Sequence, residues 1–122
     1  MEKKKILIVD DDFSVRETLC DILRAEGYEV TEASSGADAI DKTASADFDC
    51  VIIDLRLPDI DGIKVIERMS DKISKNKIIV ITGYASPELL SKTLTEAEYF
   101  LLLKPVEPEQ LLAIVKKIIY GD

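Results

Sequence analysis

The chain contains no histidine, only two cysteines and no long apolar run. The absence of histidine excludes any mechanism that uses the protein's own imidazole. Cys20 and Cys50 lie inside apolar patterns without the spacing of metal ligands, so we expect them to be reduced core residues. The apolar run after the lysines at positions 3–5 is only as long as a strand, and no stretch is long enough to span a membrane. We therefore expect a cytoplasmic protein without a signal peptide.

Basic residues are also scarce, since 16 lysines and arginines stand against 24 aspartates and glutamates, which gives a net charge of −8. This acidity argues against the chain binding nucleic acid or an anionic membrane by itself. We assign most of the charge to solubility, with one acidic cluster as the exception. The length of 122 residues fits one domain over residues 1–122, and 47% apolar residues are sufficient for a core.

Strand-like and helix-like segments alternate along the chain. The predicted strands cover residues 5–9, 28–32, 49–53, 77–81 and 99–103. Three of them are nearly continuous runs of β-branched residues and leucine, which is typical of strands covered on both faces. Alternation with helices indicates parallel strands joined by right-handed crossovers. The sequence therefore predicts an α/β fold, a three-layer α/β/α sandwich around a five-stranded parallel sheet.

Capping residues indicate where the helices begin. Ser14 is expected to begin the first helix in a capping box with Glu17, and Gly27 follows the end of that helix. The other helices are expected to begin at Ser34-Ser35, Gly62, Ser86-Pro87 and Pro108. The apolar residues expected to face the core from the second helix are Ala37, Ile40 and Ala44. The aspartates interpreted as turn formers or helix caps are Asp12, Asp59 and Asp61.

The polar residues that end the strands indicate a single site. Four apolar runs end, in chain order, in residues 10–12, Asp54, Thr82-Gly83 and Lys104-Pro105. Open parallel sheets bind ligands beyond the carboxyl ends of their strands, where the strand order reverses. Because all four polar ends lie at that edge of the predicted sheet, we expect them to share one site.

Crowded carboxylates at this edge predict a divalent metal ion. Asp10, Asp11 and Asp54 would repel one another without a cation, and Mg²⁺ is the hard ion that suits oxygen ligands, with Mn²⁺ as a substitute. A carboxylate can also attack phosphorus and become an acyl phosphate, provided that the phosphoryl oxygens are positioned and neutralised. Lys104 supplies an ammonium group and Thr82 a hydroxyl for this task, and the glycine after Thr82 leaves room and a backbone N–H.

The complete set of motifs resembles the receiver domain of bacterial two-component response regulators, over the whole chain. The matching motifs are Val9-Asp10-Asp11, Asp54 with Leu57-Pro58 and Asp61-Gly62, Thr82-Gly83, and Lys104-Pro105. The resemblance implies a flavodoxin-like strand order of 2-1-3-4-5, a phosphoacceptor role for Asp54 and a cis Lys104-Pro105 bond. It also implies that Asp11, Asp54 and the backbone carbonyl of Arg56 hold Mg²⁺, with Asp10 assisting largely through water.

The same resemblance implies partners. The phosphoryl donor would be a phosphohistidine on a sensor histidine kinase or a histidine phosphotransfer protein, in agreement with the lack of histidine in this chain. The chain would be a phosphorylation-operated switch that catalyses only its own phosphorylation and dephosphorylation, not a turnover enzyme. Its output face would comprise the fourth helix, fifth strand and fifth helix, available to a downstream effector, a fused output domain or a second copy in a homodimer.

Some positions depart from that family or vary within it. Leu101 stands where the family commonly has Tyr or Phe, so we expect the loop around Tyr84 to carry more of the response. Arg56 and Tyr84 flank the site. Their side chains either screen the acyl phosphate from water or point to solvent, and the sequence leaves both interpretations open.

Three other functions share parts of this pattern. A haloacid-dehalogenase-type phosphatase also uses Asp and Mg²⁺, but it needs a second Asp two residues after the nucleophile, where this chain has Arg56. A flavodoxin-like FMN binder needs a Ser/Thr/Gly-rich loop after the first strand, where this chain has three aspartates. A receiver-like interaction module that never binds phosphate would not need the complete site.

Overall fold

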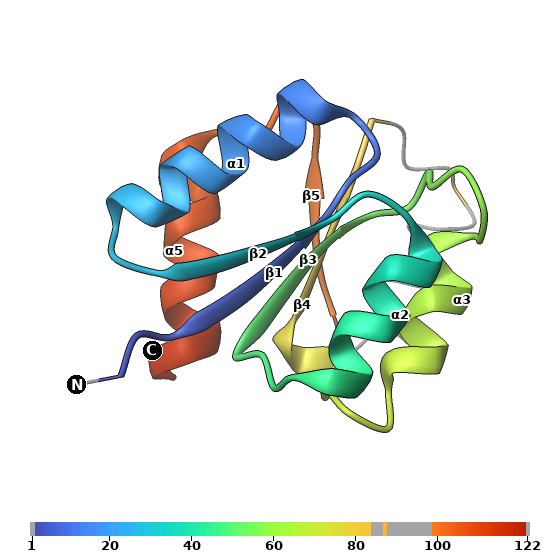
Figure 1. The fold of residues 1–122 in the computed structure, drawn as a ribbon. Helices are drawn as coiled ribbons and strands as arrows, with labels where there is room; N and C mark the ends of the chain where they lie inside the picture. Colours follow the sequence, from blue (N-terminus) through green and yellow to red (C-terminus); the bar gives the residue numbers. More distant parts are fainter. Residues whose placement is uncertain (1, 84–86, 88–98, 122) are drawn as a thin grey trace.

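In a computed structural model, the chain is described over residues 2–83, 87 and 99–121 (Figure 1). The strands are β1 (Lys5–Val9), β2 (Glu29–Ala33), β3 (Cys50–Asp54), β4 (Ile78–Thr82) and β5 (Phe100–Leu103). The helices are α1 (Phe13–Ala25), α2 (Gly36–Ser45), α3 (Gly62–Met69) and α5 (Pro108–Tyr120), with a short 3-10 helix at Lys75–Lys77. Tyr84 and the helix predicted to begin at Ser86 lie outside the described residues.

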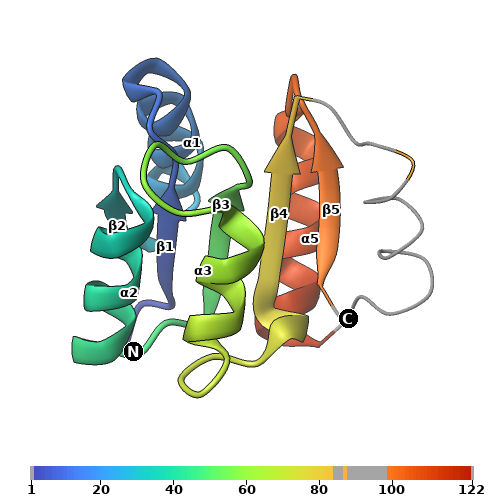
Figure 2. The same cartoon turned by 90° about the vertical axis from the view of Figure 1, so that its right-hand side faces the viewer.

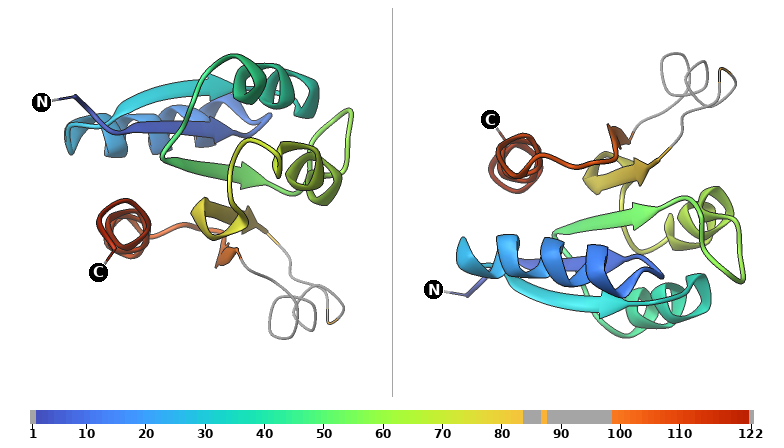
Figure 3. Two further views of the ribbon diagram at one scale, coloured as in Figure 1. Left: turned by 90° about the horizontal axis from the view of Figure 1, so that it is seen from below. Right: turned by 90° about the horizontal axis from the view of Figure 1, so that it is seen from above.

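The five strands form one parallel sheet in the order β2-β1-β3-β4-β5, which confirms the predicted fold. Figure 2 shows α2 and α3 on the near side of the sheet and α1 and α5 behind it. Figure 3 shows α5 end-on, with β4 and β5 between it and α3. The strand order reverses between β1 and β3, so the expected ligand position lies beyond the carboxyl ends of these two strands.

The predicted strand boundaries 28–32, 49–53 and 77–81 are wrong by one residue, since β2, β3 and β4 begin and end one residue later. The predicted strand 99–103 begins one residue too early, since β5 begins at Phe100 and ends at Leu103. Asp54 pairs with Ile81 and Thr82 pairs with Leu103 in the sheet. The predicted strands ended where the apolar run meets a polar side chain. The strand continues through that residue, because the hydrogen bonds between strands are made by the backbone and not by the side chain. The sheet therefore fixes Asp54 and Thr82 directly.

The sheet separates two apolar cores. Because side chains alternate along a strand, Ile52 packs with residues of α1 and α5, whereas Ile53 packs with residues of α2 and α3. Every residue of β3 and β4 is buried. Burial of each such aliphatic side chain stabilises the fold by roughly 1.5–3 kcal/mol. The central strands therefore give the residues at their carboxyl ends a rigid support.

Helix α1 is capped by Asp12, so the predicted capping box of Ser14 and Glu17 is wrong. The Oδ1 atom of Asp12 accepts hydrogen bonds from the backbone N–H groups of Ser14 at 2.9 Å and Val15 at 3.2 Å. An aspartate caps a helix as well as a serine does. Because Asp12 comes earlier in the chain, the helix already begins at Phe13.

The other helix ends follow the predictions more closely. Ser35 caps α2, and Asp61 caps α3 by accepting a hydrogen bond from the N–H of Ile63 at 3.0 Å. Pro108 occupies the first position of α5. Gly27 follows α1 with a positive φ of 93°, a conformation that favours glycine.

The buried face of α2 differs from the prediction, because Ala37 and Ala44 are exposed. The buried residues of α2 are Gly36, Ala39 and Thr43. Ile40 packs against the core from a partly buried position. Thr43 is buried without an unsatisfied hydroxyl, since its Oγ1 donates to the Ala39 carbonyl at 3.0 Å. A prediction of the buried face from apolar residues alone misses both Thr43 and Gly36, and Gly36 makes room for close packing.

The two cysteines are buried and unpaired, as predicted. Burial raises the pKa of the Cys20 thiol to about 11 and that of Cys50 to about 12, so both are packing residues at neutral pH. Among the described residues, the helices are too short or too polar to span a membrane.

Candidate functional site

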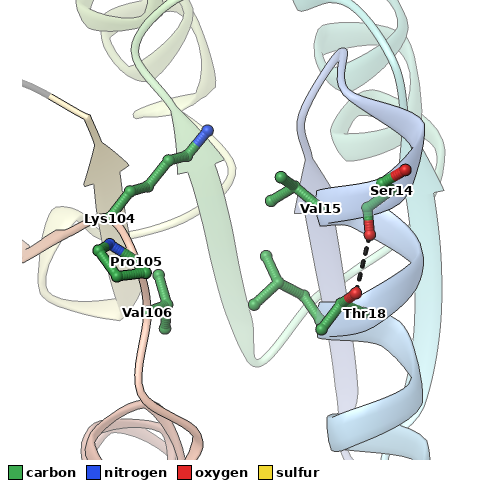
Figure 4. A pocket seen from close by; sticks show the side chains of 7 residues that line it. Ser14, Val15, Thr18, Lys104, Pro105 and Val106 are labelled. Carbon is green, nitrogen blue, oxygen red and sulfur yellow. Dashed lines mark hydrogen bonds between the residues drawn. The ribbon is translucent and has the colours of Figure 1, made fainter.

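The structure brings Asp10, Asp54 and Lys104 together at the carboxyl edge of the sheet. The Lys104 Nζ atom lies 2.7 Å from Asp54 Oδ2 and 3.3 Å from Asp10 Oδ2. Asp10 follows β1, Asp54 ends β3 and Lys104 follows β5. Figure 4 shows the Lys104 side chain extending away from its neighbours Pro105 and Val106. Three strand ends thus supply two carboxylates and one ammonium group to one point.

Asp11 completes an acidic cluster with Asp10 and Asp54. Each of the three residues offers a carboxylate oxygen, and these atoms lie within 4.8 Å of one another. Asp10 is fully buried, Asp54 is 4% exposed and Asp11 is exposed. Asp10 Oδ2 makes no hydrogen bond in the described part of the chain and has only its ionic contact with Lys104. A donor set made entirely of oxygen, with one buried oxygen that accepts no hydrogen bond from the described residues, fits Mg²⁺.

The backbone after β3 is tightly held. Asp54 Oδ1 accepts a hydrogen bond from the Arg56 N–H at 2.9 Å, while the Arg56 side chain is exposed. Gly62 closes the loop with a hydrogen bond from its N–H to the Leu55 carbonyl at 3.1 Å. A Cβ atom at Gly62 would lie 2.6 Å from Leu55 Cα, so a glycine is required there. The loop carrying the Arg56 carbonyl therefore has little freedom at its two ends.

Thr82 and Lys104 are linked through the backbone. Thr82 is 2% exposed, and its carbonyl accepts a hydrogen bond from the Lys104 N–H at 2.8 Å. The Lys104–Pro105 peptide bond is cis, as expected. A Cβ atom at Gly83 would meet no described atom within 4 Å. The end of β4 thus lies next to the residue that supplies the ammonium group.

Burial and charge shift the pKa values of two site residues. Burial raises the pKa of Asp10 above its usual value, and the nearby Asp54 carboxylate raises it further. Burial by itself lowers the pKa of Lys104, but the Asp54 and Asp10 carboxylates outweigh this effect, so the pKa of Lys104 is raised. Lys104 is therefore an ammonium ion at neutral pH.

Sequence reasoning missed Arg16, which supports the acidic cluster from α1. Its Nη1 donates to the Asp10 carbonyl at 2.7 Å and its Nε donates to Glu32 Oε1 at 3.0 Å. The Arg16 side chain is only 13% exposed, so both bonds are partly buried. A basic residue in the first turns of a helix, directly after an acidic strand end, is the signal that could have indicated it.

Leu101 and the start of α1 lie near this site on opposite sides of the sheet. Leu101 is partly buried and packs against the core on the α2 and α3 side of the sheet. On the other side, an apolar pocket separates the first turns of α1 from the chain after β5. Its lining residues are Ser14, Val15, Thr18, Leu19, Lys104, Pro105 and Val106 (Figure 4).

Asp10→Asn is expected to stabilise the metal-free protein by about 1 kcal/mol, or roughly 4 °C in Tm, because it removes a buried charge. The folded-state pKa of Asp10 is raised, so the ionised carboxylate destabilises the fold above that pKa. This cost shrinks as the pH falls below the folded-state pKa and is absent below the pKa of the unfolded chain. Thermal unfolding in EDTA at pH 7 and at lower pH measures the gain, which should shrink on acidification. The exposed Asp11→Asn should gain less, and a lower Tm for Asp10→Asn at pH 7 would contradict the argument.

Comparison with known proteins identifies the class to which this fold and acidic site belong. A family model described as "Response regulator receiver domain" matches residues 6–116. The chain therefore belongs to the receiver-domain family of two-component response regulators. Members of this family interact with histidine kinases and output domains, and they bind Mg²⁺ at an acidic pocket.

Individual relatives agree with this assignment. The chain is 32% identical over 119 residues to "Sporulation initiation phosphotransferase F" of Bacillus subtilis (strain 168), which covers 96% of this chain and 94% of that protein. It is 29% identical over 118 residues to "Chemotaxis protein CheY" of Treponema pallidum (strain Nichols), which covers 94% of this chain and 82% of that protein. It is 32% identical over 113 residues to "Regulatory protein AtoC" of Escherichia coli (strain K12), but this match covers 93% of the chain and only 24% of that protein.

Solved structures support the same fold. A CheY-like receiver domain protein from Methanospirillum hungatei JF-1 has a TM-score of 0.90 at 33% identity and covers 98% of this chain and 96% of that one. The receiver domain of the hybrid histidine kinase CckA has a TM-score of 0.80 at 29% identity and covers 94% of this chain and 98% of that one. The family assignment thus replaces the phosphatase and FMN-binding alternatives.

Proposed function

We propose that Asp54 is the phosphoacceptor of this receiver domain. The observation that carries the proposal is the arrangement of its carboxylate, with Oδ1 held by the Arg56 N–H and Oδ2 paired with the Lys104 ammonium. One oxygen is thus fixed in direction, while the other faces a cation that can move to a phosphoryl oxygen. The donor is a phosphohistidine on a sensor histidine kinase or a histidine phosphotransfer protein, and the chain acts as a switch that catalyses its own phosphorylation and dephosphorylation.

In the transfer, an Asp54 carboxylate oxygen forms a bond to phosphorus as the P–N bond to the donor imidazole breaks and the imidazole leaves with the electron pair. Lys104 then pairs with a phosphoryl oxygen, and the Thr82 hydroxyl donates to another. Asp11, Asp54 and the Arg56 carbonyl, assisted by Asp10, would hold Mg²⁺ or Mn²⁺. The bound ion would neutralise charge on the phosphoryl oxygens.

We further propose that the response to phosphorylation reaches partners through the fourth helix, β5 and α5. Leu101 has no ring or hydroxyl, so the loop around Tyr84 carries more of this response. An effector, a fused output domain or a second copy of the chain would bind that face, in the cytoplasm. The side chains of Arg56 and Tyr84 either screen the acyl phosphate or point to solvent.

Incubation with acetyl phosphate and Mg²⁺ is expected to add a single phosphoryl group to the protein, measured by intact-mass spectrometry. An excess of EDTA should prevent the addition, because the crowded carboxylates then repel the phosphate. Hydroxylamine should remove the adduct, since it cleaves an acyl phosphate but not a phosphoserine ester. Failure to form an adduct with either Mg²⁺ or Mn²⁺ would contradict the proposal.

A further inference from the structure

Asp59 attaches the loop between β3 and α3 to the first turn of α2. Its Oδ1 accepts a hydrogen bond from the Gly36 N–H and its Oδ2 accepts one from the Ala37 N–H, both at 2.9 Å. These N–H groups are among those that a helix leaves without an intrahelical partner. Ser35 caps the next one by accepting from the Asp38 N–H at 3.1 Å. Asp59 thus completes the cap of α2 from a segment more than 20 residues away.

Close packing holds this contact in place. A Cβ atom at Gly36 would lie 2.8 Å from Val65 Cγ2 and 3.1 Å from Ile60 Cβ, so α2 approaches the loop and α3 through a glycine. The hydrogen bonds from Ala37 and Gly36 lower the pKa of Asp59, so the carboxylate is ionised near neutral pH. The positive end of the helix dipole favours this charge. A shift of the loop would therefore break two charge-assisted hydrogen bonds.

We propose that Asp59 is a positioning residue for the metal site, because it fixes the loop that carries the Arg56 carbonyl. This inference rests on the proposed function, in which that carbonyl is a metal ligand. The loop is held at its ends by the Arg56–Asp54 and Gly62–Leu55 hydrogen bonds, and Asp59 is its one described side-chain bond to another helix. Without this anchor, metal binding must also order the loop, which costs conformational entropy.

The coupling runs in both directions. If Asp59 lowers the entropy cost of binding Mg²⁺, then Mg²⁺ must stabilise the contact between Asp59 and α2 by the same free energy. Mg²⁺ is therefore expected to slow amide hydrogen exchange at Gly36 and Ala37, although neither residue is a metal ligand. This slowing should disappear in Asp59→Ala.

Asp49→Ala is a matched control for Asp59→Ala. Asp49 Oδ2 accepts a hydrogen bond from the Lys5 N–H at 2.8 Å, so it also joins two elements through a backbone N–H, but at the opposite edge of the sheet. Both variants remove one negative charge. In calorimetric titration with Mg²⁺, we expect Asp59→Ala to bind about tenfold more weakly, at the lower end of the roughly 10–100-fold loss typical of residues that orient metal ligands. Asp49→Ala should bind Mg²⁺ with the affinity of the wild type. In EDTA its Tm should fall by about as much as that of Asp59→Ala.

Equal Mg²⁺ affinities for Asp59→Ala and Asp49→Ala would overturn the inference and leave the proposed phosphoacceptor intact. A wild type that binds no Mg²⁺ would overturn both. If Asp59→Ala does not fold, Asp59→Asn replaces it, because the amide keeps one acceptor oxygen and should give an intermediate affinity. An unchanged affinity in Asp59→Asn, together with unchanged exchange at Gly36 and Ala37, would count against the inference.

Discussion

Asp54→Asn is expected to reduce phosphate incorporation from acetyl phosphate below detection while leaving the fold intact. The carboxamide is close in shape to the carboxylate, and its oxygen can still accept the hydrogen bond from the Arg56 N–H. It has no anionic oxygen to attack phosphorus, and loss of a nucleophile costs orders of magnitude in rate. Intact-mass spectrometry after incubation with acetyl phosphate and Mg²⁺ measures the effect, with circular dichroism as the check on folding.

Asp61→Asn is the matched control for this variant. Asp61 lies in the same loop region, caps α3 and is exposed, and its oxygen can still accept from the Ile63 N–H after the change. It should therefore be phosphorylated like the wild type. Wild-type incorporation in Asp54→Asn would show that the nucleophile is another residue.

Lys104→Met is expected to change phosphorylation and metal binding in opposite directions. The rate of phosphorylation should fall about 100-fold, because a group that stabilises charge in the transition state is lost. The affinity for Mg²⁺ should rise about tenfold, or roughly 1.4 kcal/mol, because the ammonium no longer competes for the oxygens of Asp54 and Asp10. Methionine keeps most of the alkyl chain, so packing around the pocket beside α1 is largely retained.

Single-turnover phosphorylation and calorimetric titration with Mg²⁺ separate the two effects. Lys116→Met on the exposed surface of α5 removes the same charge away from the acidic cluster, and both quantities should stay near the wild-type values. Weaker Mg²⁺ binding in Lys104→Met would show that the lysine orders the site instead of competing with the metal.

The sequence predicted the fold and the members of the site because both follow from strand order. Apolar runs alternating with helices determine a parallel sheet, and the carboxyl ends of its strands necessarily meet at one edge. Asp10, Asp54 and Lys104 therefore converge although more than 40 residues separate each from the next. The predicted ends of β3 and β4 were one residue too early, before Asp54 and Thr82. Both residues have polar side chains, but their backbones still pair with the neighbouring strands.

Other contacts depend on tertiary geometry that no local pattern contains. The prediction that Asp59 forms a turn or caps a helix is confirmed, because it caps α2, but α2 precedes it by more than 20 residues and the sequence did not indicate which helix it caps. In the sequence, Arg16 resembles any other charged helix residue. Only the structure shows that it donates a hydrogen bond to the Asp10 carbonyl. Asp12 and not Ser14 caps α1, although both residue types are good caps. The direction of the chain after β1 decides between them.

The division of the interior by the sheet has a consequence for how substitutions combine. Ile52 and Ile53 are neighbours in sequence, yet they belong to cores on opposite faces of the sheet. Residues without shared contacts generally contribute additively to stability. A substitution in the core beneath α1 and α5 and one in the core beneath α2 and α3 are therefore expected to change the free energy of unfolding additively.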